Sequence, residues 1–120
     1  MSFWLKRDGE EGTFDMSNRA WGTILSIGRI YDWEPHGTIF ENFEEYGVEG
    51  WGGDYMLNMY QTVTSEDALN LGNALSKSLT DNFQKLVGTA LEFVLEDKEG
   101  SAGFVESVIN YVKRGSFRLG

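Results

Sequence analysis

Residues 64–79 read TSEDALNLGNALSKSL, and this stretch sets the kind of fold that the chain can form. Thr64 precedes an acid at the third helical position, which resembles a capping box and favours the positive end of the helix dipole. Small and apolar residues then recur at helical spacing, at Ala68, Leu71, Gly72, Leu75 and Leu79. The stretch predicts a helix with one apolar face that other parts of the chain must cover.

Three further helices are predicted by the same periodicity. The first covers residues 18–32. The third begins at Asp81 and carries its apolar pattern as far as Val94, and this pattern is the most regular in the chain. The fourth is capped by Ser101 and ends before Gly115, which favours a left-handed stop. The expected core consists of Trp21, Ile24, Leu25, Leu71, Leu75, Phe83, Leu86, Val87, Leu91, Val108 and Ile109.

The two ends of the chain are predicted to form a small antiparallel sheet. Residues 3–15 have the pattern of a hairpin, and residues 116–119 are a candidate strand beside it. Residues 34–63 are irregular, with a short strand or turn expected within 55–63. A chain of 120 residues is close to the commonest domain size. The predicted class is therefore α+β, mainly helical with about four helices, in a single globular domain 1–120.

Acidic and aromatic residues are concentrated in one segment. The 47 residues between Arg29 and Lys77 contain no lysine or arginine but nine carboxylates, so the whole net charge of −9 arises there. Such a segment attracts cationic partners and repels nucleic acid and anionic membranes. We expect a surface within residues 32–60 that binds a basic protein. Its candidate residues are Trp33, Glu34, Glu41, Glu44, Glu45, Trp51, Asp54 and Tyr55.

Several chemistries are disfavoured by composition. The chain has no cysteine, which excludes disulfides, thiolate metal sites and cysteine nucleophiles. It has one histidine and no Gly-x-Ser-x-Gly elbow, so a serine triad is not indicated. We therefore predict no catalytic residue and no cofactor. No apolar run reaches the roughly 18 residues of a membrane span, and the N-terminus lacks a signal-peptide pattern, so a cytoplasmic location is expected.

A metal site is one alternative for the start of the acidic segment. Asp32, Glu34 and His36 alternate, and an extended backbone would place all three side chains on one face. Two carboxylates and one histidine are a known ligand set for transition metals. A turn exposed to solvent explains the same residues more simply, because three neighbouring residues need distant ligands to complete a site. No metal is predicted.

Two other functions remain open from the sequence. Carboxylate pairs near Trp33, Trp51 and Tyr55 are also typical of carbohydrate clefts, where two acids flank a glycosidic bond. A small-molecule or sugar-binding domain, with or without hydrolysis, is therefore an alternative. A homo-oligomer whose exposed aromatic residues bury one another is another. The simplest interpretation of the same residues is a solvated acidic loop with its aromatic rings turned into the core.

Four short motifs are spread over residues 20–118. They are W-x2-IL at Trp21, W-x-P-x-GT at Trp33, Y-x2-N-x2-Q-x-VT-x2-DA-x2-L-x2-AL from Tyr55 to Leu75, and G-x-F at Gly115. Together they resemble a family of small, uncharacterised bacterial cytosolic proteins. The chain departs from that pattern at Tyr60, where the family favours a glycine. The resemblance implies a shared architecture and brings no activity with it.

Overall fold

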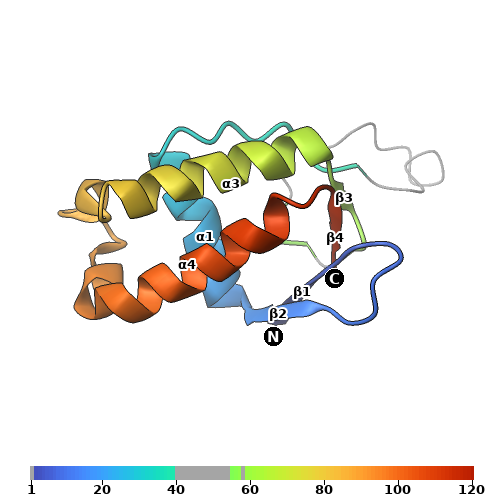
Figure 1. The fold of residues 1–120 in the computed structure, drawn as a ribbon, viewed down its shortest axis with the longest axis horizontal. Coiled ribbons are helices and arrows are strands. Elements are labelled where there is room, and N and C mark those ends of the chain that lie inside the picture. Colours follow the sequence, from blue (N-terminus) through green and yellow to red (C-terminus); the bar gives the residue numbers. More distant parts are fainter. Residues whose placement is uncertain (1, 40–54, 58) are drawn as a thin grey trace.

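A computed structural model describes residues 2–39, 55–57 and 59–120 (Figure 1). Within these ranges, three α-helices are formed by Asn18–Ile30 (α1), Ser65–Thr80 (α3) and Lys98–Val112 (α4). Four strands, Ser2–Lys6 (β1), Phe14–Ser17 (β2), Thr62–Val63 (β3) and Phe117–Leu119 (β4), form one antiparallel sheet in the order β2-β1-β4-β3. The predicted α+β class is confirmed, as is a sheet that joins the N-terminal hairpin to the C-terminal strand.

Helix α3 is the central helix of the fold. Its N-cap is Thr64, whose hydroxyl accepts a hydrogen bond from the Asp67 backbone N–H at 3.2 Å, as the sequence predicts. Helix α3 packs against both α1 and α4, and Figure 1 shows α3 beside α4 with α1 crossing behind them. A Cβ atom at Gly28 of α1 would lie 2.7 Å from Leu71 Cδ1. Glycine at position 28 therefore permits the close approach of α1 to α3.

The buried apolar side chains form a single cluster to which the sheet and the three helices contribute. Trp21 is fully buried. The centroid of its ring lies 6.4 Å from that of the Phe3 ring in β1 and 6.3 Å from that of the Phe117 ring in β4. The predicted core is right for eight residues, namely Trp21, Ile24, Leu71, Leu75, Phe83, Leu86, Val108 and Ile109. Leu25 and Leu91 are only partly buried, and Val87 is 58% exposed, so its prediction is wrong.

The predicted third α-helix is wrong. Residues after α3 form only two 3₁₀ helices, Gln84–Leu86 (η1) and Glu92–Asp97 (η2). Phe83 adopts a φ of +58° and Gly88 a φ of +78°, and a right-handed helix passes through neither conformation. Asp81 does not begin a new helix but is the C-cap of α3, and its carboxylate accepts a hydrogen bond from the Tyr31 hydroxyl at 2.5 Å. The chain turns here so that Phe83 and Leu86 enter the core.

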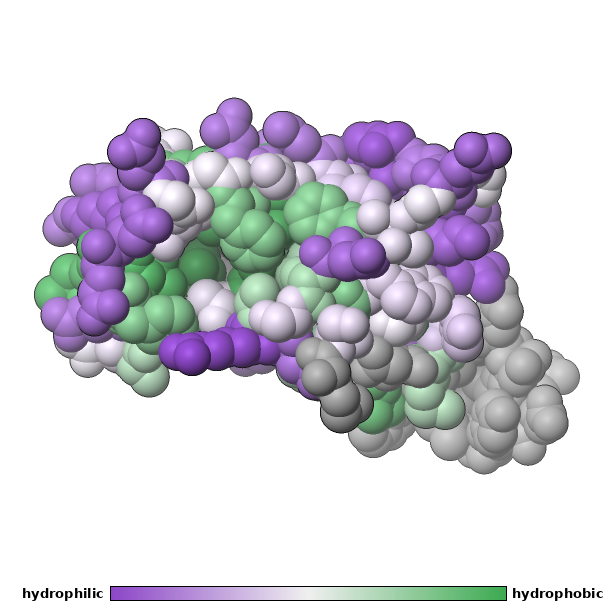
Figure 2. Space-filling view, turned by 90° about the horizontal axis from the view of Figure 1, so that it is seen from below, coloured by the Kyte–Doolittle hydropathy of each residue, from purple (hydrophilic) through white to green (hydrophobic). Residues whose placement is uncertain are grey.

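The start of α4 also differs from the prediction. Asp97, rather than Ser101, is the N-cap, and its carboxylate accepts a hydrogen bond from the Gly100 N–H at 3.1 Å. The Ser101 hydroxyl donates instead to the Val94 carbonyl at 3.1 Å and so ties η2 to α4. The face of the molecule seen in Figure 2 carries apolar residues gathered around a hollow. Residues of α1, η2 and α4 line a hollow of about 260 Å³.

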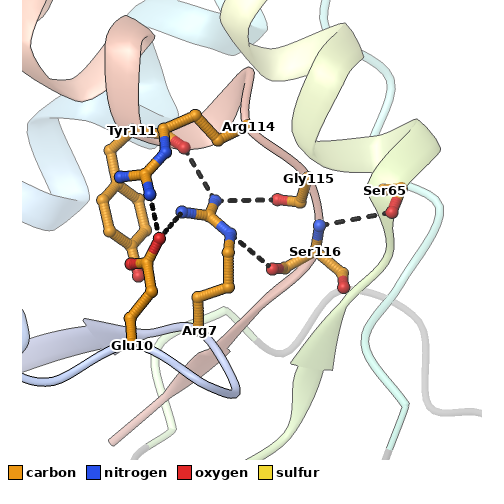
Figure 3. Close-up of polar contacts among 7 residues, drawn as sticks. All are labelled: Arg7, Glu10, Ser65, Tyr111, Arg114, Gly115 and Ser116. Carbon is orange, nitrogen blue, oxygen red and sulfur yellow. Dashed lines mark hydrogen bonds and ion pairs between the residues drawn. The ribbon is translucent and has the colours of Figure 1, made fainter.

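Arg7 joins the N-terminal hairpin to the end of α4 (Figure 3). Its guanidinium donates to the backbone carbonyls of Tyr111, Gly115 and Ser116 at 2.7, 3.1 and 3.2 Å, and lies 4.4 Å from the centroid of the Tyr111 ring. A cation at the carbonyl end of a helix is favoured by the helix dipole. Glu10 of the hairpin loop forms ion pairs with Arg7 and Arg114. Arg7 and Arg114 therefore help to hold the N-terminal hairpin against the end of α4.

Tyr60 stands at a turn that favours glycine. Its φ is +61°, in the left-handed region that side chains rarely adopt. Glycine adopts this conformation without the steric cost that a side chain brings. The Tyr60 ring packs against Trp4 with 5.2 Å between centroids. That contact offsets part of the conformational cost.

Candidate functional site

The carboxylate of Asp67 is a buried polar centre in the first turn of α3. Asp67 is fully buried. Its Oδ1 accepts hydrogen bonds from Trp33 Nε1 at 2.9 Å and from the backbone N–H of His36 at 3.4 Å. Its Oδ2 accepts a hydrogen bond from the Tyr55 hydroxyl. Buried carboxylates need such donors, because an unpaired charge in the core is strongly destabilising. We call Asp67, Trp33, His36 and Tyr55 the Asp67 network.

Tyr55 is held by further contacts. Its hydroxyl oxygen accepts a hydrogen bond from the Gly37 N–H at 2.9 Å, and its backbone carbonyl accepts one from Trp21 Nε1 at 2.7 Å. The Tyr55 and Trp33 rings meet edge to face with 5.1 Å between centroids. Residues 33–37 and residue 55 stand on either side of residues 40–54 in the sequence. The Asp67 network therefore fixes the described ends of the acidic segment against α3.

Burial and the hydrogen bond to Asp67 raise the pKa of the Tyr55 phenol above its ordinary value of about 10. At neutral pH the phenol therefore stays protonated and donates to the Asp67 carboxylate. Desolvation and the hydrogen bond to Asp81 likewise raise the pKa of Tyr31. Burial also raises the pKa of Tyr111. Each of the three phenols therefore stays protonated in the folded state to a more alkaline pH than a free tyrosine does.

Because the pKa of Tyr55 is raised, the contribution of the Asp67 network to the free energy of unfolding can be measured at alkaline pH. The folded state holds the phenol proton more tightly than the unfolded state, so this stabilisation is complete below about pH 10 and is lost as pH rises above it. We expect Tyr55→Phe to be less stable than the parent at pH 8 and to lose stability less steeply above pH 10. Urea unfolding between pH 8 and pH 11 measures both effects. Part of the slope remains in the variant, because Tyr31 and Tyr111 also have raised pKa values.

Tyr60→Phe is the matched control, since Tyr60 is 59% exposed and lies outside the Asp67 network. An unchanged alkaline slope in Tyr55→Phe would show that the buried hydrogen bond to Asp67 does not control the ionisation of Tyr55.

The residues predicted to bind a partner fall into three groups in the structure. Trp33 and Tyr55 are only 3% and 4% exposed, so their rings lie in the core and act as anchors. Glu34 is exposed. The other predicted residues, Glu41, Glu44, Glu45, Trp51 and Asp54, lie outside the described residues.

Glu34 lines a polar hollow of about 430 Å³ between residues 31–36 and α3. Asp32, His36, Asn73 and Lys77 are exposed around it. The hollow presents two carboxylates and two asparagine amides, which accept hydrogen bonds from cationic side chains, together with the ammonium group of Lys77. It is the part of the predicted acidic surface that the described residues contain.

The alternative metal site at Asp32, Glu34 and His36 is not assembled. Across residues 2–39, 55–57 and 59–120, no group of three or more histidine, aspartate or glutamate side chains is placed to hold a metal ion. The backbone gives the reason, because Asp32 has a φ of +75° and the segment is therefore not extended at that residue. All three residues border the same hollow, but their side chains are not brought together as a ligand set.

Sequence reasoning missed the structural role of Asp67, which it treated as a capping acid. One signal was present in the sequence. Asp67 lies one helical turn before Leu71 and next to Ala68, both on the apolar face of the predicted helix. An acidic residue at the edge of an apolar helix face indicates a buried carboxylate, which must accept hydrogen bonds from other parts of the chain. Its donors come from residues 12 to 34 positions away in the sequence, and spacing alone does not identify them.

Comparisons with protein-family models, with curated proteins and with solved structures found no match to this chain. Membership of the resembled bacterial family therefore stays a prediction. The fold and the Asp67 network define an α+β domain in which an acidic segment is attached at a buried polar centre. In the described parts of the chain, no helix is long and apolar enough to cross a membrane.

Proposed function

We propose that this chain is a non-enzymatic binding domain that presents its acidic, aromatic segment 32–60 to a cationic protein, in the manner of an immunity protein. The observation that carries the proposal is the segregation of charge. The 47 residues without one lysine or arginine contain nine carboxylates, and seven of these lie in residues 32–60. Like charges confined to one region repel one another in the folded state, and a cationic partner relieves that repulsion when it binds.

The Asp67 network supports this function through preorganisation. Binding costs less conformational entropy when the binding segment is already held in place. The contacts of Asp67 with Trp33, His36 and Tyr55 hold the described ends of the acidic segment on α3. The buried aromatic rings thus serve the acidic surface indirectly, as its attachment points.

Exposed apolar side chains near the acidic segment support the same function. Ile39, Met56, Leu57, Met59 and Tyr60 are each between 37% and 59% exposed. Methionine and aromatic side chains are enriched at the centres of protein interfaces, which are surrounded by polar rims. These apolar side chains belong to the same segment of sequence as Asp32 and Glu34, whose carboxylates would steer a basic partner.

The charge proposal predicts a slower association rate when carboxylates are neutralised. The tagged domain is used to capture partners from lysate at low salt and in 0.5 M salt, and a protein lost in high salt is identified and purified. We expect Glu41→Gln/Glu44→Gln/Glu45→Gln to slow association with that protein about tenfold at low salt and to change its dissociation rate little. Stopped-flow mixing at several ionic strengths measures both rates.

The matched control is Glu92→Gln/Glu96→Gln/Glu106→Gln, which removes the same charge from exposed positions outside the segment. Equal slowing by both triple variants would mean that net charge alone steers the partner, and the proposed surface would be wrong. One readout needs no partner: the first triple variant should melt at a higher temperature than the parent at low salt, because neutralisation relieves repulsion that salt otherwise screens. A lower melting temperature would show that these carboxylates make specific stabilising pairs.

A further inference from the structure

The apolar hollow between α1 and α4 is formed by the way the helices pack. Helix α3 packs against both other helices, and the hollow separates α1 from α4 on the face shown in Figure 2. Its floor consists of Ile24 and Ile27 from α1, Val94 from η2 and Val105 from α4, each at most 5% exposed. The hollow has a volume of about 260 Å³. Such a floor offers an apolar ligand a preformed site.

One cation stands at this hollow, and no carboxylate lines it. The Arg19 guanidinium carbon lies 5.1 Å from the centroid of the Phe93 ring, which is itself 39% exposed. Within the described residues, Arg19 has no ion-pair partner among the carboxylates. The first turn of α1, where Arg19 lies, contains no acidic residue. Arg19 is therefore the one charged side chain among the described residues that line the hollow.

We propose that this hollow binds a small amphipathic carboxylate, with its apolar body against Ile24, Ile27 and Val105 and its carboxylate at Arg19. A guanidinium pairs with a carboxylate through two parallel hydrogen bonds, and Arg19 is exposed, so its guanidinium is accessible to a ligand in the hollow. The rest of the lining is apolar or hydroxylic, so it selects a hydrocarbon body. The site is separate from the acidic segment 32–60 and adds a small-molecule ligand to a domain proposed to bind a protein.

The size and charge of the hollow favour a small ligand over a protein surface. A stable protein interface buries roughly 1,200–2,000 Å² in total, and small-molecule sites have volumes from about 300 Å³. The hollow is close to the lower end of that second range. Among the described residues that line the hollow, Arg19 is the one charged side chain, and it calls for one anionic group attached to a short apolar body.

The probe for this site is sodium octanoate, titrated into isotope-labelled protein and followed by NMR. We expect saturable shifts confined to the signals of Ile24, Ile27, Val94 and Val105. Hexanoate should bind about tenfold more weakly, because each buried methylene contributes about 0.8 kcal/mol. Acetate lacks the hydrocarbon chain and 1-octanol lacks the negative charge, so each should bind more weakly than octanoate.

Two variants separate the roles of charge and cavity. Arg19→Gln should weaken octanoate about tenfold and leave the affinity for 1-octanol unchanged, because only the charged hydrogen bonds are lost. Ala20→Leu, which lengthens a side chain on the wall of the hollow, should weaken both ligands. The matched control is Arg29→Gln, which removes the same charge from an exposed position on the same helix and should bind octanoate as the parent does.

Several outcomes would overturn the proposal. Shifts that do not saturate, or that spread over the whole molecule, would show non-specific adsorption. Equal octanoate affinity in Arg19→Gln and Arg29→Gln would remove Arg19 from the site. Shifts of the same four residues that depend on protein concentration, with no response to octanoate, would show that the face binds a second copy of the chain instead.

Discussion

Replacing Asp67 with alanine is expected to lower the free energy of unfolding by about 3–5 kcal/mol, because each buried donor left without an acceptor costs about 1–3 kcal/mol. The three donors are Trp33 Nε1, the His36 N–H and the Tyr55 hydroxyl. Partial relaxation and entry of water keep the total below the sum of the individual costs. Urea unfolding at pH 7, with comparison of the slopes, measures the change.

Two variants control this result. Glu66→Ala removes the same charge from an exposed position in the same helical turn and should cost at most about 1 kcal/mol, through the helix dipole. Asp67→Asn keeps the shape and one acceptor oxygen for Trp33 and His36 but gives the Tyr55 hydroxyl no carboxylate, so its cost should fall between the two. A loss in Asp67→Ala no larger than in Glu66→Ala would show that the Asp67 network does not stabilise the fold.

The variant Asp67→Asn also tests the proposed function, because it should loosen the backbone of the acidic segment where that segment is attached to α3. In Asp67→Asn the folded protein should remain, while the amide hydrogens of His36 and Gly37 should exchange faster with solvent than in the parent. Those amides donate to Asp67 and to Tyr55 respectively. Faster exchange there, with unchanged exchange in α4, would locate the loosening at the attachment points of the segment.

The elements predicted correctly from sequence depend on local signals. Thr64 caps α3 because its hydroxyl reaches the N–H of Asp67 three residues later, and both partners are visible in the sequence. The hairpin and the β4 strand follow from short alternating patterns bounded by turn residues. The third helix failed for the opposite reason. Its apolar spacing is regular, but Phe83, whose side chain is buried in the core, and the exposed Gly88 both adopt left-handed backbone conformations that end a right-handed helix.

The candidate site depends on contacts that are distant in the sequence, and for this reason it was only partly predictable. The acidic character of the segment follows from composition, but composition does not say whether an aromatic ring faces the partner or the core. Trp33 and Tyr55 turn inward because their N–H and O–H groups find a buried carboxylate at Asp67. The hollow beside Arg19 depends on the placement of α1 against α4, which no local pattern encodes.

Trp21→Ala is expected to lower the free energy of unfolding by about 3–5 kcal/mol from the lost ring and the resulting cavity. The side chain is fully buried between Phe3 and Phe117. Its Nε1 also donates to the Tyr55 carbonyl at 2.7 Å, and loss of that donor leaves a buried carbonyl unpaired. The effect should therefore lie in the upper part of the range. Thermal and urea unfolding measure it, with Trp4→Ala, at a partly exposed indole of the sheet, as the control.

Trp21→Phe separates the hydrogen bond from the cavity, because phenylalanine keeps most of the apolar volume and lacks the N–H. Trp21 and the Asp67 network hold the same residue, Tyr55, from two sides. A double-mutant cycle of Trp21→Phe with Tyr55→Phe should therefore be non-additive, with the second change costing less once the first has released residue 55. Additivity within about 0.5 kcal/mol would mean that the two contacts act independently. The hydrogen bond from Trp21 and the Asp67 network would then hold residue 55 independently rather than as one coupled network.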